Sequence, residues 1–199
     1  MNHSISIFKI FHYPSNMKAT GIILAGGKSS RMNYQDKAWL LYEGKPLIHH
    51  AINRLSLQVA QILISRNSSD QRYEKLPYTC IPDLNHNLDG PLAGILACSS
   101  HVTNPLSLVI PCDSPNVPEN LKSLLLPHLS GADAVVPSFG GICQPLFILA
   151  KTSILGSIAP YISAGGRSVK GWLQNLSIAQ VDFMSQEPFK NINSPEQLK

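Results

Sequence analysis

The stretch GIILAGGKSSRMNYQDK, residues 21–37, decides the fold. Its apolar part, residues 22–24, is continuous and β-prone, which is typical of a strand buried on both faces of a parallel sheet. The strand should end where Ala25, Gly26 and Gly27 begin. Because glycine has no Cβ, the backbone N–H groups of such a turn can approach a ligand closely. The stretch therefore predicts a first buried strand that leads directly into a ligand-binding loop.

Three cations follow the glycines, Lys28, Arg31 and Lys37. Fixed positive charge beside accessible backbone N–H groups suits a polyphosphate, and an ordinary strand-to-loop turn with solvated cations is the alternative. The loop contains neither GxxxxGK followed by Ser or Thr nor GxGxxG, so it is neither a P-loop nor a dinucleotide fingerprint. We therefore interpret it as a nucleotide-binding loop of another kind.

Length, charge and cysteine content limit the class of protein. The 199 residues suffice for one substantial α/β domain and barely for two small ones. The net charge is +4, but the basic residues are scattered, so no nucleic-acid partner is expected. The four cysteines form no CxxC pair, which predicts neither a zinc site nor a redox pair and favours a reduced cytoplasmic protein. No apolar run approaches the length of a membrane span, so no membrane contact is expected.

The beginning of the chain differs in character from the rest. Polar residues interrupt its apolar residues, and no small-residue cleavage site follows, so a secretory signal is not expected. Residues 1–17 are predicted to be a disordered leader, or a segment upstream of a true start at Met17. Residues 18–199 are then predicted to form a single domain, with no internal repeat or low-complexity linker.

Apolar runs alternate with helical patterns along this domain. Strands are expected at 62–64, 78–81, 106–110, 134–136, 144–149 and 178–183, and helices at 46–55, 91–98, 118–129, 151–161, 169–173 and from Ser194. The strand at 144–149 follows its predecessor through a Gly140-Gly141 turn rather than a helix, so at least one antiparallel strand is expected. The pattern predicts a Rossmann-like three-layer α/β/α sandwich with a mostly parallel sheet. Gly94, inside a predicted helix, indicates close packing or approach of a ligand.

Polar residues follow several of these strands, where the sheet edge should lie. Four of them, residues 65–68, follow the second strand, and Asn67 is placed to meet a base or ribose, although an Asn there is most often a turn residue. Asp113 follows the strand at 106–110, where ligands bind in an open parallel sheet. Because a triphosphate enzyme needs Mg²⁺ held by one or two carboxylates, Asp113 is the preferred metal ligand and Asp83 the second candidate. For Asp113, a turn or cap role is the alternative.

Several motifs stand in one order: LAGGKSSRM, DK, ISRN, PD before GPLAGI, PCDSP, QPL, GGRSV and FKNINSPEQL. Together they resemble the molybdenum cofactor guanylyltransferase family of the nucleotidyltransferase superfamily, from about Gly21 to Leu198. The resemblance implies a fold like that of the nucleotide-diphospho-sugar transferases. It implies transfer of GMP from GTP to the phosphate of Mo-molybdopterin, with release of pyrophosphate and with Mg²⁺ as cofactor. Further implied are transient contacts with cofactor-supplying and client molybdoenzyme proteins, and a monomer or weak oligomer.

The resemblance also implies roles for individual residues. The implied GTP-binding residues are Leu24, Ala25, Gly26, Lys37, Asn67, Asp83 and Asp113, and Asp113 would also hold Mg²⁺. The catalytic set is Arg31, Lys37 and Asp113, in which the two cations would stabilise the leaving pyrophosphate. Asn33 stands where a glycine usually follows Arg-Met, and Asn tolerates the left-handed region better than most residues. Cys112 is expected to be a small packed residue rather than a nucleophile.

The C-terminal half is implied to receive molybdopterin. The residues that fall on its motifs are Gln144, Pro145, Gly165, Arg167, Asn191 and Asn193, and Ser168 replaces a second cation often found after the arginine. For Asn191 and Asn193, capping of a C-terminal turn is the alternative to ligand contact. Two other functions stay open: a related nucleotidyltransferase that uses CTP on the same pterin or acts on a sugar phosphate, and a non-catalytic, nucleotide-dependent carrier of the cofactor.

Overall fold

The computed structural model describes residues 13–26, 36–67, 69–83 and 90–193. One eight-stranded sheet forms the middle layer, in the order β10-β7-β9-β6-β1-β4-β5, with β8 paired to β7. Its strands are β1 (Ala19–Leu24), β4 (Gln61–Arg66), β5 (Thr79–Pro82), β6 (Leu106–Pro111), β7 (Ala134–Phe139), β8 (Ile142–Cys143), β9 (Ile148–Lys151) and β10 (Ile178–Asp182). The helices are α1 (Leu47–Ser56), α2 (Pro91–Ser99), α3 (Leu121–Leu125), α4 (Ile158–Ser163) and α5 (Val169–Leu173). The three-layer fold class predicted from the sequence is confirmed.

Strand β1 lies in the middle of the sheet, as its continuous apolar run predicts. All six of its residues are buried, and it pairs in parallel with β4 on one side and β6 on the other. Its last residue, Leu24, lies opposite Ser65 of β4 and Pro111 of β6. Because parallel neighbours end at the same edge, the segments that follow these three strands are brought together in space.

Strand β9 runs antiparallel to both of its neighbours, β6 and β7, which confirms the prediction of at least one antiparallel strand. It begins at Ile148 rather than at Gln144 as predicted. The difference is local: Pro145 has no N–H to donate to a sheet, and the N–H of Phe147 donates to the Gln144 carbonyl at 3.2 Å, which closes a turn.

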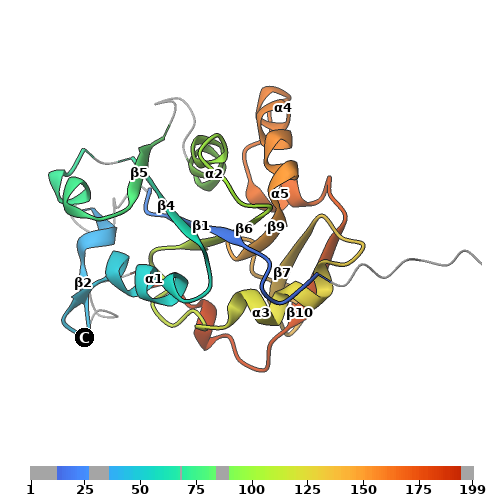
Figure 1. The fold of residues 1–199 in the computed structure, drawn as a ribbon, viewed down its shortest axis with the longest axis horizontal. Helices are drawn as coiled ribbons and strands as arrows, with labels where there is room; N and C mark the ends of the chain where they lie inside the picture. Colours follow the sequence, from blue (N-terminus) through green and yellow to red (C-terminus); the bar gives the residue numbers. More distant parts are fainter. Residues whose placement is uncertain (1–12, 27–35, 68, 84–89, 194–199) are drawn as a thin grey trace, which may run out of the picture.

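Two hydrophobic layers enclose the sheet. Helices α1 and α3 cover one face, and α2, α4 and α5 cover the other (Figure 1). Helix α1 buries five apolar residues against the first face, namely Leu47, Ile48, Ala51, Ile52 and Leu55. On the second face the Trp172 side chain is only 1% exposed, and its indole N–H donates to the Ser157 hydroxyl at 2.9 Å. The hydrophobic core thus holds the central strands rigidly from both sides.

Several helical segments are shorter and tighter than the sequence pattern predicts. The helix expected at 151–161 is a 3₁₀ helix, η4 (Thr152–Ser157), followed by α4, and the helix expected at 118–129 is α3 followed by η3 (Leu126–Leu129). Pro127 follows the end of α3 closely, and a proline cannot continue an α-helix without loss of a hydrogen bond. The predicted terminal helix from Ser194 lies outside the described residues.

A small hairpin, β2 (Leu41–Tyr42) and β3 (Lys45–Pro46), precedes α1 and was not expected. Its two-residue loop, Glu43 and Gly44, has positive φ at both positions, 48° and 73°. This is the conformation of a tight hairpin turn, in which glycine is favoured because it has no Cβ. The glycine after Glu43 was the available sequence signal.

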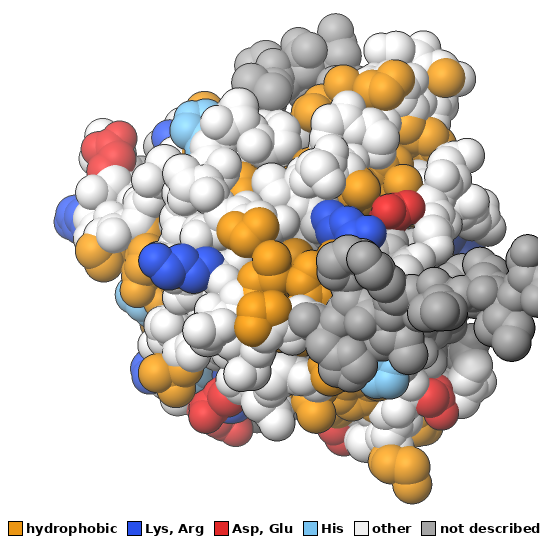
Figure 2. Space-filling model, turned by 45° about the vertical axis from the view of Figure 1, so that its right-hand side comes forward, with side chains coloured by type: hydrophobic (Ala, Val, Ile, Leu, Met, Phe, Trp, Pro, Cys, Tyr) orange, Lys and Arg blue, Asp and Glu red, His pale blue; other side chains and the backbone are white. Residues whose placement is uncertain are grey.

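Among the described side chains on the face drawn in Figure 2, basic and acidic ones are scattered among uncharged ones. Within the described residues, none of the helices combines the length and the apolar character needed to cross a bilayer. At the start of the chain, the partly buried Tyr13 and Met17 pack against the core. The predicted leader boundary at residue 17 stays a prediction, since residues 1–12 lie outside the described part.

Candidate active site

The candidate site lies where the chain order reverses in the sheet. From β1 the chain passes to β4 and β5 on one side, and it then crosses to β6 on the other side of β1. Open α/β sheets bind ligands outside the carboxyl ends of their strands at such a switch point. Gly26 follows β1 there, and Asp113 follows β6. The N–H of Cys112 donates to the Leu24 carbonyl at 3.0 Å, which ties the two strand ends together.

Lys37 and Asp113 form an ion pair at this edge. The Lys37 ammonium donates to Oδ2 of Asp113 at 2.6 Å and to the amide oxygen of Asn193 at 2.8 Å. The side chains of Lys37 and Asp113 are 20% and 16% exposed, so the pair is partly shielded from water. The structure thereby joins three residues that are remote in sequence and that the sequence motifs singled out.

The other carboxylate oxygen of Asp113 is differently placed. Oδ1 is buried and accepts no hydrogen bond from any described residue. A buried acceptor without a donor is costly, because it has lost its water and gained nothing in return. Within the described residues, no group of three or more His, Cys, Asp or Glu side chains could hold a metal ion. A cation at Oδ1 would therefore take most of its ligands from a substrate and from water.

The backbone of Lys37 is held by a short 3₁₀ helix, η1 (Lys37–Trp39). The Asp36 side chain caps this helix by accepting from the Ala38 N–H at 3.1 Å. Ala38 is fully buried, and the Trp39 ring meets the Tyr73 ring edge-on with their centroids 5.1 Å apart. Because its neighbours are packed or capped, Lys37 projects from a fixed point of the backbone.

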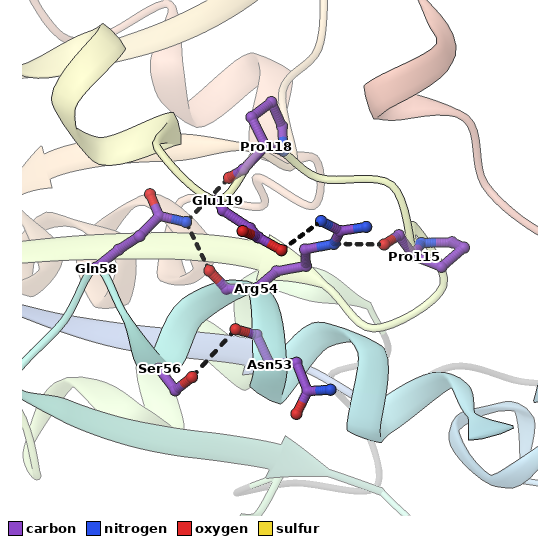
Figure 3. A network of polar contacts seen from close by, with 7 residues as sticks. All are labelled: Asn53, Arg54, Ser56, Gln58, Pro115, Pro118 and Glu119. Atoms are coloured by element: carbon purple, nitrogen blue, oxygen red, sulfur yellow. Dashed lines mark hydrogen bonds and ion pairs between the residues drawn. The ribbon is translucent and has the colours of Figure 1, made fainter.

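The loop that carries Asp113 is fixed by helix α1 (Figure 3). The Arg54 guanidinium donates to the Pro115 carbonyl at 3.1 Å and forms an ion pair with Glu119 at 2.8 Å. Gln58, which is 8% exposed, donates to the Pro118 carbonyl at 2.9 Å. These contacts hold the segment after Asp113 against the helix, and the spacing of polar residues on α1 gave no sign of them.

The last described residues fix the same loop from the opposite side. The N–H of Ile192 donates to the Asp113 carbonyl at 2.8 Å, and the Ser114 hydroxyl donates to the Asn191 amide oxygen at 2.7 Å. Asn193 reaches Lys37. The sequence left two roles open for Asn191 and Asn193, capping of a turn and contact with the ligand. In this structure their side chains contact Ser114 and Lys37, so they support the site residues.

A second group of polar residues lies beside Gly26. Asp83 follows β5, and its Oδ1 accepts from the Ser65 hydroxyl at 2.6 Å. A Cβ placed on Gly26 would lie 2.9 Å from Oδ2 of Asp83 and 3.5 Å from Cγ of Asn67. Burial raises the pKa of the Asp83 carboxyl, and the hydrogen bond from Ser65 opposes that shift. Gly26, Asn67 and Asp83 are thus brought together, as the sequence motifs predicted, and their part in ligand binding stays a prediction.

The other predicted nucleotide-binding residues are less accessible. The side chains of Leu24 and Ala25 are buried, at 6% and 4% exposure, so they belong to the core. The N–H of Ala25 donates to the Ser65 carbonyl at 2.9 Å, so sheet pairing already uses it. Arg31, the third predicted catalytic residue, lies outside the described residues, as do Gly27 and Lys28.

Besides Asn191 and Asn193, the predicted acceptor residues lie in two segments. Gln144 and Pro145 stand in the turn before β9, where the N–H of Gln144 donates to the Pro137 carbonyl at 2.8 Å. Gly165 has φ of 93°, a conformation that favours glycine, and Arg167 donates to the carbonyls of Ile162 and Gly166 at 2.9 and 2.7 Å. The guanidinium of Arg167 is thus folded back onto its own turn.

Cys112 is a packed residue, as expected. Its side chain is 5% exposed, and burial raises the pKa of its thiol well above the ordinary value. Only the thiolate is a strong nucleophile, so a thiol that stays protonated at neutral pH is a poor one. Cys112 is therefore poorly suited to act as a nucleophile.

Comparison with known proteins agrees with this arrangement. Residues 21–180 match the MobA-like NTP transferase domain. A protein of Shewanella piezotolerans is 37% identical over 179 residues, covering 88% of each chain, and one of Shewanella frigidimarina is 38% identical, covering 88% of this chain and 91% of that one. Both are described as molybdenum cofactor guanylyltransferase.

A solved structure has the same fold. The molybdopterin-guanine dinucleotide biosynthesis protein A of Archaeoglobus fulgidus superposes with a TM-score of 0.71 at 24% identity, covering 90% of this chain and 94% of that one. The fold, the site and the domain match together define a nucleotidyltransferase, which confirms the predicted enzyme class. Within that class, the chain belongs to the molybdenum cofactor guanylyltransferase family, as the order of its motifs predicted.

Proposed function

We propose that this protein transfers GMP from GTP to the phosphate of Mo-molybdopterin. The observation that carries the proposal is the Lys37–Asp113 pair at the switch point of the sheet, at the edge where Gly26 follows β1. A cation and a carboxylate with one unused oxygen form the minimal pair that can organise a triphosphate and its metal ion. The names of the two Shewanella relatives support guanine as the base and the molybdenum cofactor as the acceptor.

Asp113 fits the role of a metal ligand. Its Oδ1 is a buried acceptor without a donor among the described residues, and Mg²⁺ favours carboxylate and phosphate oxygens. When bound, Mg²⁺ supplies positive charge that neutralises the oxygens of the reacting phosphates. The two contacts that fix the Asp113 loop, from α1 and from Ile192, would keep Oδ1 in place while the substrates exchange.

The Nζ of Lys37 contacts Oδ2 of Asp113. We expect its Nζ to turn toward the triphosphate when GTP enters, because a phosphate oxygen carries more negative charge than the amide oxygen of Asn193 that Lys37 now contacts. Together with Arg31, it would offset the charge that develops on the leaving pyrophosphate.

The reaction needs no nucleophile from the protein. An oxygen of the acceptor phosphate forms a bond to the α-phosphorus of GTP while the bond from that phosphorus to the α–β bridging oxygen breaks. The bonding electrons leave with pyrophosphate. Because both reactants are anions, the task of the protein is to align them and to cancel their repulsion. The later segments with Gln144 and Arg167 are where we expect the acceptor to bind.

Thermal unfolding of the purified protein tests the nucleotide. In the presence of Mg²⁺, GTP at 100 times its dissociation constant should add about 2.7 kcal/mol of stability. For a chain of this size, this corresponds to a rise of roughly 5 to 10 °C in Tm. CTP at the same concentration is the control. Stabilisation by CTP alone would contradict the guanylyl assignment and favour a cytidylyl enzyme.

Release of pyrophosphate tests the reaction itself. The purified protein with GTP, Mg²⁺ and molybdopterin should release pyrophosphate, whereas a carrier that only presents the cofactor to client enzymes would release none. We expect the reaction to take place in the cytoplasm, with brief contacts to proteins that supply the cofactor and to the enzymes that receive it.

A further inference from the structure

The contact between Ser65 and Asp83 links the ends of two neighbouring strands. Ser65 is 1% exposed and lies near the end of β4, and its hydroxyl donates to Oδ1 of Asp83 at 2.6 Å. Parallel pairing places the Ser65 backbone opposite Ile81, two residues before Asp83. Both the hydroxyl and the carboxylate are therefore held by the sheet.

Helix α2 leaves room for this hydroxyl at one glycine. A Cβ on Gly94 would lie 2.2 Å from the Ser65 hydroxyl oxygen, a distance that would force the hydroxyl to move, and 3.0 Å from its Cβ, which is a tight contact. Glycine inside a helix costs roughly 0.5–1 kcal/mol relative to alanine. The space that glycine leaves for the Ser65 hydroxyl explains why a glycine stands in this helix despite that cost.

The second oxygen of Asp83 faces the nucleotide-binding loop. Oδ2 lies 2.9 Å from the point where a Cβ on Gly26 would stand, so the carboxylate bridges from Ser65 on one side to the loop after β1 on the other. A carboxylate with only one oxygen anchored could rotate about its Cβ–Cγ bond. A short hydrogen bond to Oδ1 from a buried donor restricts that rotation.

We infer that Ser65 is a positioning residue for the nucleotide: its hydroxyl holds the Asp83 carboxylate so that Oδ2 stays beside Gly26, ready to accept hydrogen bonds from the nucleoside. This inference rests on the proposed function, since it takes GTP as the ligand. The clearance above Gly94 belongs to the same arrangement, because a side chain there would displace the hydroxyl.

The charge on Asp83 also depends on this contact. Burial raises the pKa of the carboxyl and the Ser65 hydrogen bond lowers it, so the hydroxyl favours the charged form that accepts from a ligand. From α2, the buried Cys98 thiol faces the same region; burial, and to a smaller extent the Asp83 charge, raises the pKa of that thiol to about 12. The thiol is neutral and cannot replace the hydroxyl as a strong donor.

The experiment compares full-length wild-type protein with Ser65→Ala by titration calorimetry with GTP and Mg²⁺ and by steady-state kinetics. We expect the dissociation constant and KM for GTP to rise about tenfold while kcat changes less than threefold, since the chemistry at Asp113 is untouched. The loss of GTP affinity on acidification should begin at a higher pH in Ser65→Ala. Ser107→Ala is the matched control, because it also removes a buried strand hydroxyl, one that contacts Thr152 instead of a site carboxylate.

A double-mutant cycle with Asp83→Ala, which removes the acceptor of the Ser65 hydroxyl, separates positioning from packing. If Ser65 acts through Asp83, removal of its hydroxyl should have little further effect on GTP affinity in the Asp83→Ala background, whereas a packing effect would add in full. Should Ser65→Ala fail to fold, Ser65→Cys fills the space with a somewhat larger group that is a weaker donor. If the wild type binds GTP and Ser65→Ala has the same GTP affinity and pH dependence, this inference alone is overturned. Full additivity in the cycle would overturn it too. Absence of GTP binding by the wild type would overturn the proposed function as well.

Discussion

The two oxygens of Asp113 have different surroundings, and this difference gives a single carboxylate two uses. Oδ2 is paired with Lys37, and Oδ1 is buried with no donor among the described residues. An aspartate that only formed a surface ion pair would leave its second oxygen in water. The burial of Oδ1 therefore favours a metal ion that arrives with the substrate.

The Asp113→Asn variant tests this use of Oδ1. The amide keeps the size of the side chain but loses the negative charge that attracts Mg²⁺, so turnover should fall at least about 100-fold. Pyrophosphate release at saturating GTP measures the loss, and a Tm within a few degrees of the wild type shows that the fold is intact. Near-normal turnover would place the metal on another carboxylate, and Asp83 would be the first to examine.

Some site residues were predictable from the sequence and others were not. Asp113 and Asn67 each follow a strand, and strand ends can be read from apolar runs, so their meeting at one edge was foreseeable. Ser65 was predicted to follow the second strand, but β4 runs on to Arg66 and includes it. The direction of its side chain could not be predicted. Arg54 lies on a helix, and its contact with the Pro115 carbonyl depends on the path of a distant loop. Such tertiary contacts leave no local pattern.

At the scale of elements, the packing of α1 on β1 sets the position of the first strand. A Cβ on Gly21 would lie 2.7 Å from Cδ1 of Leu55 and 3.1 Å from Cγ2 of Val59. The helix therefore lies closer to the strand than any residue other than glycine would allow without movement. The apolar run predicts the strand, and only the structure shows that its first glycine serves the packing of α1.

The Gly21→Ala variant should destabilise the fold. The nearest atoms are the ends of flexible side chains, which can move at a cost, so we expect the free energy of unfolding to fall by about 1–3 kcal/mol. Urea denaturation measures it, with an unchanged m value as evidence of an intact fold. Gly156→Ala is the control, because nothing lies within 4 Å of a Cβ placed there. Equal effects of both substitutions would contradict the packing argument.

The strands and helices that the sequence predicted best are those with long apolar runs. The central strands β1, β4 and β6 lie where expected, because burial on both faces makes their sequences continuous. The short hairpin before α1 was not predicted, because it depends on the backbone geometry of two residues, Glu43 and Gly44. The 3₁₀ segments η3 and η4 were predicted as parts of longer helices. Strand order is a property of the whole fold, and only the structure gives it.

At the scale of the whole molecule, the site joins parts of the chain that are far apart. Lys37 contacts Asp113, 76 residues further along, and Asn193, 156 residues further along. The segment 191–193, remote in sequence, therefore contacts both Lys37 and the loop that carries Asp113. Because the pair depends on contacts of such long range, it exists only when the whole domain is folded.

The charge of Asp83 links the site to global stability. Burial raises the pKa of this carboxyl in the folded protein above its ordinary value of roughly 4. The folded state thus keeps the proton to a higher pH than the unfolded state does, so this group lowers stability as pH rises through that window. At neutral pH the charged Asp83 is a cost to the fold, which we attribute to its use in binding.

Asp83→Asn should therefore raise the Tm at pH 7 while it weakens GTP binding. Its Oδ1 can still accept from Ser65, so the neutral amide keeps the hydrogen bond and avoids the cost of burying a charge. The gain in Tm should shrink on acidification and vanish below pH about 4, where the wild-type carboxyl is protonated in both states. Melting curves of both proteins from pH 3 to 8 without nucleotide measure this. A lower Tm of Asp83→Asn than of the wild type at pH 7 would show that the charged carboxylate stabilises the fold. It would then contradict the view that Asp83 lowers stability and is kept for ligand binding.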